Sequence, residues 1–435
     1  MTKLKTFYNL PMFAFIFLVI ITYILLFYFL SKLDLRLDFV SFYASALAYN
    51  NHSNPYTALS ATFLSTNEKL PINLNPPFFM EFIRPLALLN YKDAVILWSV
   101  SIFILGLIGA YFSFKLTLKP VFFRKHWFYC LMMYLAFYPT IMSINLAQIG
   151  GLLLFFIIIG YFFYRKNNNF YAGILWGIII SLKLFPALLF IFAWKEKRYQ
   201  VVVIMIITCL IAHLIPIFTY GINIYSLYFS LLRRVLWYSD SWNASIYGFL
   251  FRFLVDPYSR NPDLWLVQLI YYITFISGLI WYIKRLNYLD LDRNNHRSFC
   301  LTLVVMLVLS PLGWLYYFPL LIMPLVDLYE SSEQGPPITL DMSLWIISFL
   351  FVNFPIGYLA AHQMPPDIFY KLTCFSVYFY GLLIMAYLLS KPKVRHVASN
   401  LESNIMGKNY LLFPAMLILS FGLFIPLLVF VTHLP

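Results

Sequence analysis

The stretch Leu33–Tyr43 (LDLRLDFVSFY) follows directly on the first long apolar run, residues 7–30, and its charges mark the place where the chain leaves the hydrocarbon. Apolar runs of about 20 residues, the length that a helix needs to cross a bilayer, recur along the rest of the chain. The pattern predicts an all-α polytopic membrane protein that forms a single integral membrane domain over residues 1–435. The first run has no small-residue cleavage site, so we expect a retained span rather than a signal peptide.

The composition excludes several protein classes. Hydrophobic residues make up 62% of the chain and charged residues only 11%, which is more apolar surface than a soluble fold can bury. The net charge is +13, but the basic residues cluster between apolar runs, as in cytoplasmic loops. We therefore predict no nucleic-acid binding. The four cysteines lie inside apolar runs without CxxC spacing, which predicts packed thiols rather than disulfides or a metal site.

Basic clusters set the predicted topology. Lys3 and Lys5 precede the first run and place the N-terminus in the cytoplasm. The chain then forms a large first external loop over residues 31–91, which carries Asp38, and a second external loop over residues 220–262. Counting the apolar runs predicts roughly 10–12 transmembrane or half-membrane helices. Continuous spans are expected at about 93–114, 127–144, 201–219, 264–283, 342–360, 368–389 and 410–431. A further span is expected to follow the polar residues 145–148 and to end at Arg165 and Lys166.

Two apolar segments are predicted to break inside the membrane. Residues 170–194 are apolar except for Ser181 and Lys183, and a single crossing would place the following basic cluster outside. Two half-membrane helices that meet near Lys183 keep both flanking clusters in the cytoplasm. Non-helical backbone at this depth is tolerated only where it is buried or lines a cavity. Residues 299–327 repeat the pattern around a Pro-Gly break at 310–314.

Ionisable side chains at membrane depth are costly unless they face a cavity or a partner, so these breaks and loops predict a polar cavity on one side. Asp38 could take a proton from an acceptor hydroxyl. Alternatively, this carboxylate-rich stretch forms an interfacial salt bridge, for example between Asp34 and Arg36. Lys183 could neutralise a phosphate. Alternatively, the Lys183 side chain snorkels to the membrane interface, which its position in the middle of an apolar segment makes difficult.

Other polar side chains are weaker candidates. Arg252, on an amphipathic external helix, could hold a phosphate or be a surface cation. Gln148 and Asn243 could hydrogen-bond sugar hydroxyls or cap helix ends. No metal-ligand cluster and no phosphate-binding glycine loop occur in the sequence, so neither a metal nor a soluble nucleotide donor is predicted. The candidates for stacking on a sugar or a prenyl chain are Trp237, Trp242, Trp314 and Tyr316.

Five motifs, in their order along the chain, resemble glycosyltransferase family eighty-seven, which includes polyprenyl-phosphate-mannose-dependent α-1,2-mannosyltransferases of bacterial envelopes. The motifs are DFVSFYASA at 38–46 with NPY at 54–56 and NPPF at 75–78; AQIGGL at 147–152; AGILWG at 172–177 with SLKLFP at 181–186; NASIYG at 243–248 with Arg252; and SPLGW at 310–314. Ala147 stands where the family has glycine. Tyr316 and Tyr317 stand where family members often have histidines, and tyrosine supplies no cation near neutral pH.

The resemblance implies a GT-C type fold and an enzyme that moves mannose or another hexose, with inversion, from a polyprenyl-phosphate donor to an envelope glycan or glycolipid. It also implies an inner-membrane location, a site that faces the periplasm or exterior, contact with membrane lipids, and no cofactor besides the donor. Asp38 would be the general base. The donor phosphate would be bound by Lys183, Arg252 and Tyr316, and the sugar or acceptor by Gln148, Asn243, Trp314 and Tyr43.

Two other functions stay open. A lipid-linked sugar transporter or flippase would need a cavity that opens to both sides in turn, whereas the polar residues gather on one predicted side. A catalytically inactive scaffold of an envelope-assembly complex is compatible with Tyr316 and Tyr317 in place of the family histidines.

Overall fold

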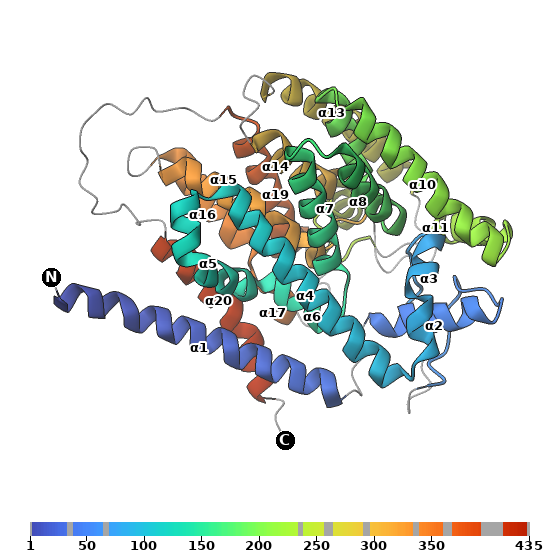
Figure 1. Cartoon of the computed structure of the whole chain (residues 1–435), viewed down its shortest axis with the longest axis horizontal. Helices are drawn as coiled ribbons and strands as arrows, with labels where there is room; N and C mark the ends of the chain where they lie inside the picture. The colour runs from blue at the N-terminus through green and yellow to red at the C-terminus, as the bar shows by residue number, and fades with distance from the viewer. Residues whose placement is uncertain are drawn as a thin grey trace. The chain divides into compact units, whose positions relative to one another are not determined.

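A computed structural model gives the architecture of the chain (Figure 1). It describes residues 2–32, 38–63, 69–233, 238–255, 264–289, 296–333, 339–359, 368–392 and 412–432. Within these ranges every regular element is a helix, and the two β-contacts are isolated bridges. The all-α prediction is therefore confirmed.

Six segments of the described chain are long and apolar enough to cross a membrane. They lie in α1 (Thr2–Lys32), α4 (Tyr91–Thr117), α10 (Tyr199–Thr219), α13 (Trp265–Leu289), the stretch Phe369–Leu389 that ends with α19 (Val377–Leu389), and α20 (Leu412–Thr432). Their outer faces carry apolar side chains, such as Leu210 at 59% and Ile211 at 57% exposure. Lipid can cover these faces, which confirms a polytopic membrane protein.

Shorter apolar helices accompany these spans. They are α7 (Gly150–Arg165), α8 (Asn169–Leu182), the stretch Phe185–Lys195 formed by η2 (Phe185–Ala187) and α9 (Leu188–Lys195), α14 (Arg297–Leu309) and α16 (Leu340–Val352). Each is too short for a full crossing at about 1.5 Å of rise per residue, so α7 is shorter than the span that was predicted to end at Arg165 and Lys166. In the described part of the chain, long and short apolar helices together fall within the predicted number.

Both predicted breaks are present. The backbone of Lys183 is extended, with φ of −152° and ψ of 123°, so α8 ends there and Pro186 lies in the first turn of η2. The second break follows α14 at Ser310, and η3 (Leu315–Leu321) and α15 (Ile322–Glu333) continue the chain. Proline disfavours helix in the residue before it and lacks an amide donor, which explains why helices stop near these positions.

Each broken segment folds back on itself. Arg198, just after α9, donates to the side chains of Asn167 at 2.5 Å and Asn169 at 3.3 Å, which flank the start of α8. Arg297 begins α14, and its Nε lies 3.0 Å from Oδ2 of Asp327 midway along α15. The chain therefore enters and leaves each segment at the same level, as the prediction of paired half-membrane helices requires.

Two segments that were predicted to be continuous helices are each broken into two helices. The span expected at 127–144 is two helices, α5 (Pro120–Ala136) and α6 (Tyr138–Asn145), with a bend of 64° between them. The span expected at 342–360 is also interrupted, because α16 ends at Val352 and α17 (Ile356–Leu359) follows Pro355. In both places a proline near the start of the second helix prevents one continuous hydrogen-bond ladder.

Side chains from distant segments complete the bend before α6. Pro139 has no amide for the carbonyl of Leu135, which instead accepts the hydroxyl of Tyr23 at 3.0 Å. The amide of Tyr138 donates to Oδ1 of Asn353 at 2.8 Å. The polar groups released by the break are thus paired inside the protein.

Contacts divide the chain into two compact units, and each is described by itself. The first unit comprises Met1–Tyr28, Ser113–Ile141 and Ser239–Pro435, and the second comprises Phe29–Phe112 and Met142–Tyr238. In the second unit α8 packs closely on α7 and α10. A Cβ at Gly160 would lie 2.4 Å from Nε1 of Trp176, and one at Gly177 would lie 2.6 Å from Cβ of Thr208. Such small residues allow close helix packing, which fixes the end of α8.

We predict that Asp327→Ala strongly destabilises the protein, by about 3–5 kcal/mol, because it leaves the buried guanidinium of Arg297 without its carboxylate. Asp341→Ala is the matched control. It breaks the more exposed pair with Lys391 and should cost less than about 1 kcal/mol. Thermal unfolding of both purified variants in detergent measures the difference, and equal losses would contradict the role of Arg297 and Asp327 in closing the fold-back.

Candidate active site

Asp38 lies directly before α2 (Phe39–Asn50) in the second unit, and its side chain is half-buried. The carboxylate does not cap the helix. The backbone carbonyl of Asp38 accepts bonds from the amide and the hydroxyl of Ser41 at 3.1 and 2.8 Å. The carboxylate accepts a hydrogen bond from Nε2 of Gln148 at 2.7 Å. Two of the residues predicted for the site, Asp38 and Gln148, are therefore in direct contact.

A tight turn between α6 and α7 presents Gln148. Ala147 has a φ of 51°, in the left-handed region that favours glycine, which gives a physical reason for the glycine expected there. Its carbonyl accepts Nε1 of Trp98 at 2.8 Å, and the amide of Gln148 donates to the carbonyl of Ser143 at 2.8 Å. These bonds fix the turn, so the buried Gln148 amide is held toward Asp38.

Lys183 lies in the break between α8 and η2, outside the six helices that can cross a membrane, and its side chain is half-buried. Its Nζ donates to Oδ1 of Asn75 at 2.5 Å. Burial lowers the pKa of Lys183 to about 7, and the nearby carboxylate of Asp38 opposes this shift. The carboxylate and the ammonium of the predicted site therefore share one electrostatic neighbourhood.

Asn75 is a site residue that sequence reasoning missed. Its amide N and its Nδ2 both donate to Oδ1 of Asn73, at 3.0 and 2.8 Å, and this orients its own Oδ1 for Lys183. Pro76 and Pro77 then start α3 (Pro77–Ile83), where proline is well tolerated. The signal was present in the NPPF motif, but nothing local indicates that its asparagine meets a lysine far along the chain.

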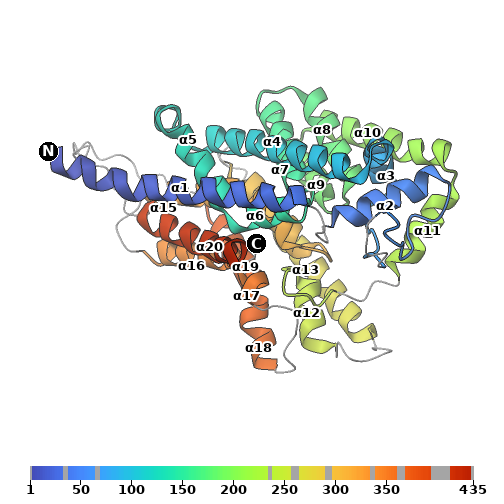
Figure 2. The same ribbon diagram turned by 90° about the horizontal axis from the view of Figure 1, so that it is seen from below.

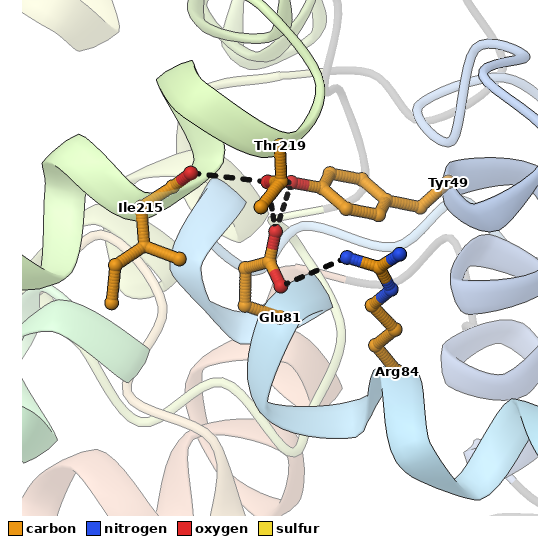
Figure 3. Close-up of polar contacts among 5 residues, drawn as sticks. All are labelled: Tyr49, Glu81, Arg84, Ile215 and Thr219. Carbon is orange, nitrogen blue, oxygen red and sulfur yellow. Dashed lines mark hydrogen bonds and ion pairs between the residues drawn. The ribbon is translucent and has the colours of Figure 1, made fainter.

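A second group of polar contacts fastens this region to α10 (Figure 3). Glu81 on α3 accepts the hydroxyl of Tyr49 on α2 at 2.6 Å, and the hydroxyl of Thr219 on α10 donates to the same oxygen. Nη1 of Arg84 lies 3.6 Å from the other carboxylate oxygen. Burial and the Glu81 bond raise the pKa of Tyr49, so its hydroxyl stays protonated. The network fixes the positions of α2 and α3 relative to each other. Asp38 directly precedes α2, and Asn75 lies just before α3.

The remaining predicted residues, apart from Tyr43, lie in the first unit. Asn243 is fully buried, and its side chain joins two loops. Its Oδ1 accepts the amide of Gly313 at 2.9 Å, and its Nδ2 donates to the carbonyl of Pro311 at 3.0 Å. The side chain that we predicted to bind a sugar thus holds the SPLGW loop in place, and its sugar contact stays a prediction.

Arg252 on α12 (Ile246–Leu254) is 1% exposed, so the alternative of a surface cation is wrong. Its Nη1 donates to the carbonyls of Asp240 and Asn243 at 2.7 and 2.8 Å. Its Nε donates to the hydroxyl of Ser376 at 3.3 Å. Ser376 follows α18 (Ile368–Leu372), which lies beside α12 (Figure 2). Burial lowers the pKa of Arg252 to about 10. These contacts give the guanidinium a structural role, and its predicted phosphate contact stays a prediction.

The aromatic candidates are packed inside their own units. Trp314 and Tyr316 are buried and stack on each other, with 5.9 Å between ring centroids. Tyr43 is buried too, and its hydroxyl donates to the carbonyl of Leu89 at 2.7 Å. Contact of these rings with a sugar or an acceptor stays a prediction. Three other residues singled out from the sequence, Asp34, Arg36 and Trp237, lie outside the described residues.

A comparison with protein families matches the model of glycosyltransferase family 87 to residues 73–311, more than half of the chain. The chain belongs to glycosyltransferase family 87. It is accordingly a membrane glycosyltransferase, and the resemblance of the motifs is confirmed. Curated proteins and solved structures give no match.

The family 87 match covers Asn75, Gln148 and Lys183 but begins after Asp38. The contacts of this glycosyltransferase tie Asp38 to the matched region through Gln148. A carboxylate can accept a proton, and an ammonium beside it can stabilise a developing negative charge. This arrangement fits a reaction in which a hydroxyl loses a proton while an anionic group departs.

We predict that Glu81→Ala lowers stability by about 1.5–3 kcal/mol and also lowers turnover, because Tyr49 and Thr219 lose their shared carboxylate. Glu81→Gln keeps an acceptor oxygen and should retain most of both. Arg84→Ala, at a side chain that is 44% exposed, should have little effect. Thermal unfolding and transferase assays of the three variants test this, and an alanine variant as active and stable as the wild type would contradict it.

Proposed function

We propose that this family 87 enzyme transfers a hexose, mannose in the first instance, from a polyprenyl-phosphate donor to a glycan or glycolipid of the cell envelope, in the inner membrane and on its outer face. The observation that carries the proposal is that one compact unit holds both the Asp38 carboxylate and the Lys183 ammonium, with the carboxylate close enough to raise the pKa of Lys183 against the effect of burial. Each is held by a neutral amide side chain, Gln148 and Asn75 respectively.

In the proposed reaction the acceptor hydroxyl oxygen attacks the anomeric carbon of the donor sugar. Asp38 takes the hydroxyl proton as the new carbon–oxygen bond forms. The bond between the anomeric carbon and the phosphate oxygen breaks from the opposite side, so the configuration inverts and polyprenyl phosphate leaves. Lys183 stabilises the charge that this phosphate gains. We expect no cofactor besides the donor, because the ammonium can supply the balancing charge.

The two amide partners have separate tasks in this proposal. The hydrogen bond from Gln148 favours the ionised carboxylate of Asp38 and orients it. The carbonyl oxygen of Asn75 accepts from Lys183 and so fixes the position of the ammonium. Neither amide carries a charge, and both hold a reactive group without neutralising it.

Family membership favours an enzyme over a lipid-linked sugar transporter. The scaffold alternative predicts no turnover from the wild-type chain with any lipid-phosphate sugar. The following experiment therefore also separates the scaffold from the enzyme.

We predict that Asp38→Asn lowers kcat by about 10²–10⁴-fold, because the amide keeps the shape but cannot accept the proton. Donor binding should change little. Asp93→Asn, at an exposed carboxylate near the start of α4, is the matched control and should keep full activity. Turnover of labelled polyprenyl-phosphate mannose by purified enzyme is the measurement, and full turnover by Asp38→Asn would exclude Asp38 as the base.

The pKa of Lys183 near 7 predicts a pH dependence. The donor is a phosphodiester whose charge does not change near neutrality, whereas Lys183 loses its positive charge as pH rises through about 7. We therefore expect kcat/KM for the donor to fall by about tenfold per pH unit above that value. Lys183→Arg stays charged and should remove this limb of the profile, and Lys183→Met should have low kcat/KM throughout. The same limb in the arginine variant would assign the titration to another group.

A further inference from the structure

A cavity of about 540 Å³ lies in the first unit, where α14 contacts both α13 and α19. Most of its lining is apolar and includes Val305, Val308 and Leu383. Gly278 contributes to the available space, since a Cβ there would lie 2.9 Å from Cδ2 of Leu309. The volume falls within the range of about 300–1,000 Å³ that is typical of small-molecule sites.

Cationic and hydroxyl groups also line this cavity. Arg285 and Tyr288 come from the last turns of α13, and the Arg285 guanidinium lies 5.9 Å from the Tyr288 ring centroid. Lys391 follows α19, with its Nζ 4.4 Å from the Tyr387 ring centroid and 2.6 Å from Oδ1 of Asp341. Among the described residues that line the cavity, Arg285 and Lys391 are the cations, and Asp341 pairs with Lys391.

The wall of the cavity belongs to helices that lipid can cover. Leu383, Tyr288 and Tyr387 are 40%, 49% and 49% exposed, and they lie on α13 and α19, both within candidate membrane spans. By the positive-inside rule, the basic ends of these helices belong to the cytoplasmic face. Basic pockets between membrane helices on that face suit anionic lipid headgroups. A suitable occupant therefore has an apolar chain and a phosphate.

We propose that this cavity binds an anionic glycerophospholipid of the cytoplasmic leaflet. Its phosphate would lie near Arg285 and Lys391, and one acyl chain would run along the apolar wall formed by α14. The residues that line the cavity do not include Asp38, Lys183 or their hydrogen-bond partners. Failure of the lipid proposal would therefore leave the transferase proposal intact, and the reverse also holds.

The test is native mass spectrometry of the full-length, delipidated protein in detergent, titrated with phosphatidylglycerol or phosphatidylcholine of identical acyl chains. We expect wild type to bind phosphatidylglycerol at least about fivefold more tightly, and Arg285→Gln to lose most of this preference. Lys284→Gln is the matched control, since it removes the same charge from an exposed neighbour that does not line the cavity, and it should keep the preference.

A second variant and two further ligands distinguish the occupants. Leu383→Trp fills the apolar part from its exposed side and should weaken binding of both lipids. Glycerol 3-phosphate, which has the phosphate without the chain, should not compete. Equal binding of the two lipids, an equal loss in Lys284→Gln, effective competition by glycerol 3-phosphate, or tighter binding of polyprenyl phosphate than of phosphatidylglycerol would each overturn the proposal.

Discussion

A polar group that lies among apolar helices must find its hydrogen-bond partner inside the protein, and this requirement governs the helix breaks of the chain. Where Pro139 removes a donor, the hydroxyl of Tyr23 takes its place at the carbonyl of Leu135. Where α8 ends, the ammonium of Lys183 meets the side-chain oxygen of Asn75. A break in one helix therefore constrains a side chain in a distant segment, and the polar sites of the enzyme arise at these places.

The hydrogen-bond partners of the charged groups differ in kind. Asp38 and Lys183 each form a hydrogen bond with a neutral amide side chain. Glu81 instead gathers two hydroxyls and a guanidinium, and Arg252 gathers backbone carbonyls. The hydrogen bonds of this latter pair join elements of the fold, while Nη2 of Arg252 is buried with no hydrogen-bond partner among the described residues.

The sequence predicts the breaks correctly where a charge or a proline stands at the centre of an apolar segment, as at Lys183 and Pro311. It fails at the bend before Tyr138, because the group that satisfies the freed amide, Asn353, comes 215 positions later. The same limit hid Asn75, whose partner lies 108 positions away. The chemical type of a residue can be read from the sequence, and the sequence therefore names the catalytic candidates. The tertiary contacts of those candidates, such as the bonds of Asn243 to the SPLGW loop, cannot be read from it.

The two fold-back segments have a consequence for how the chain can change. Arg198 beside the start of α8, and Asp327 beside the start of α14, show that each segment returns toward the place where it began. A segment that folds back in this way does not change the number of times that the chain crosses a membrane. Residues can be gained or lost at the tip of either segment without inverting every helix that follows. A helix that traverses the full bilayer has no such freedom, so sequence drift near the tips of the two segments is compatible with an unchanged orientation of the whole protein.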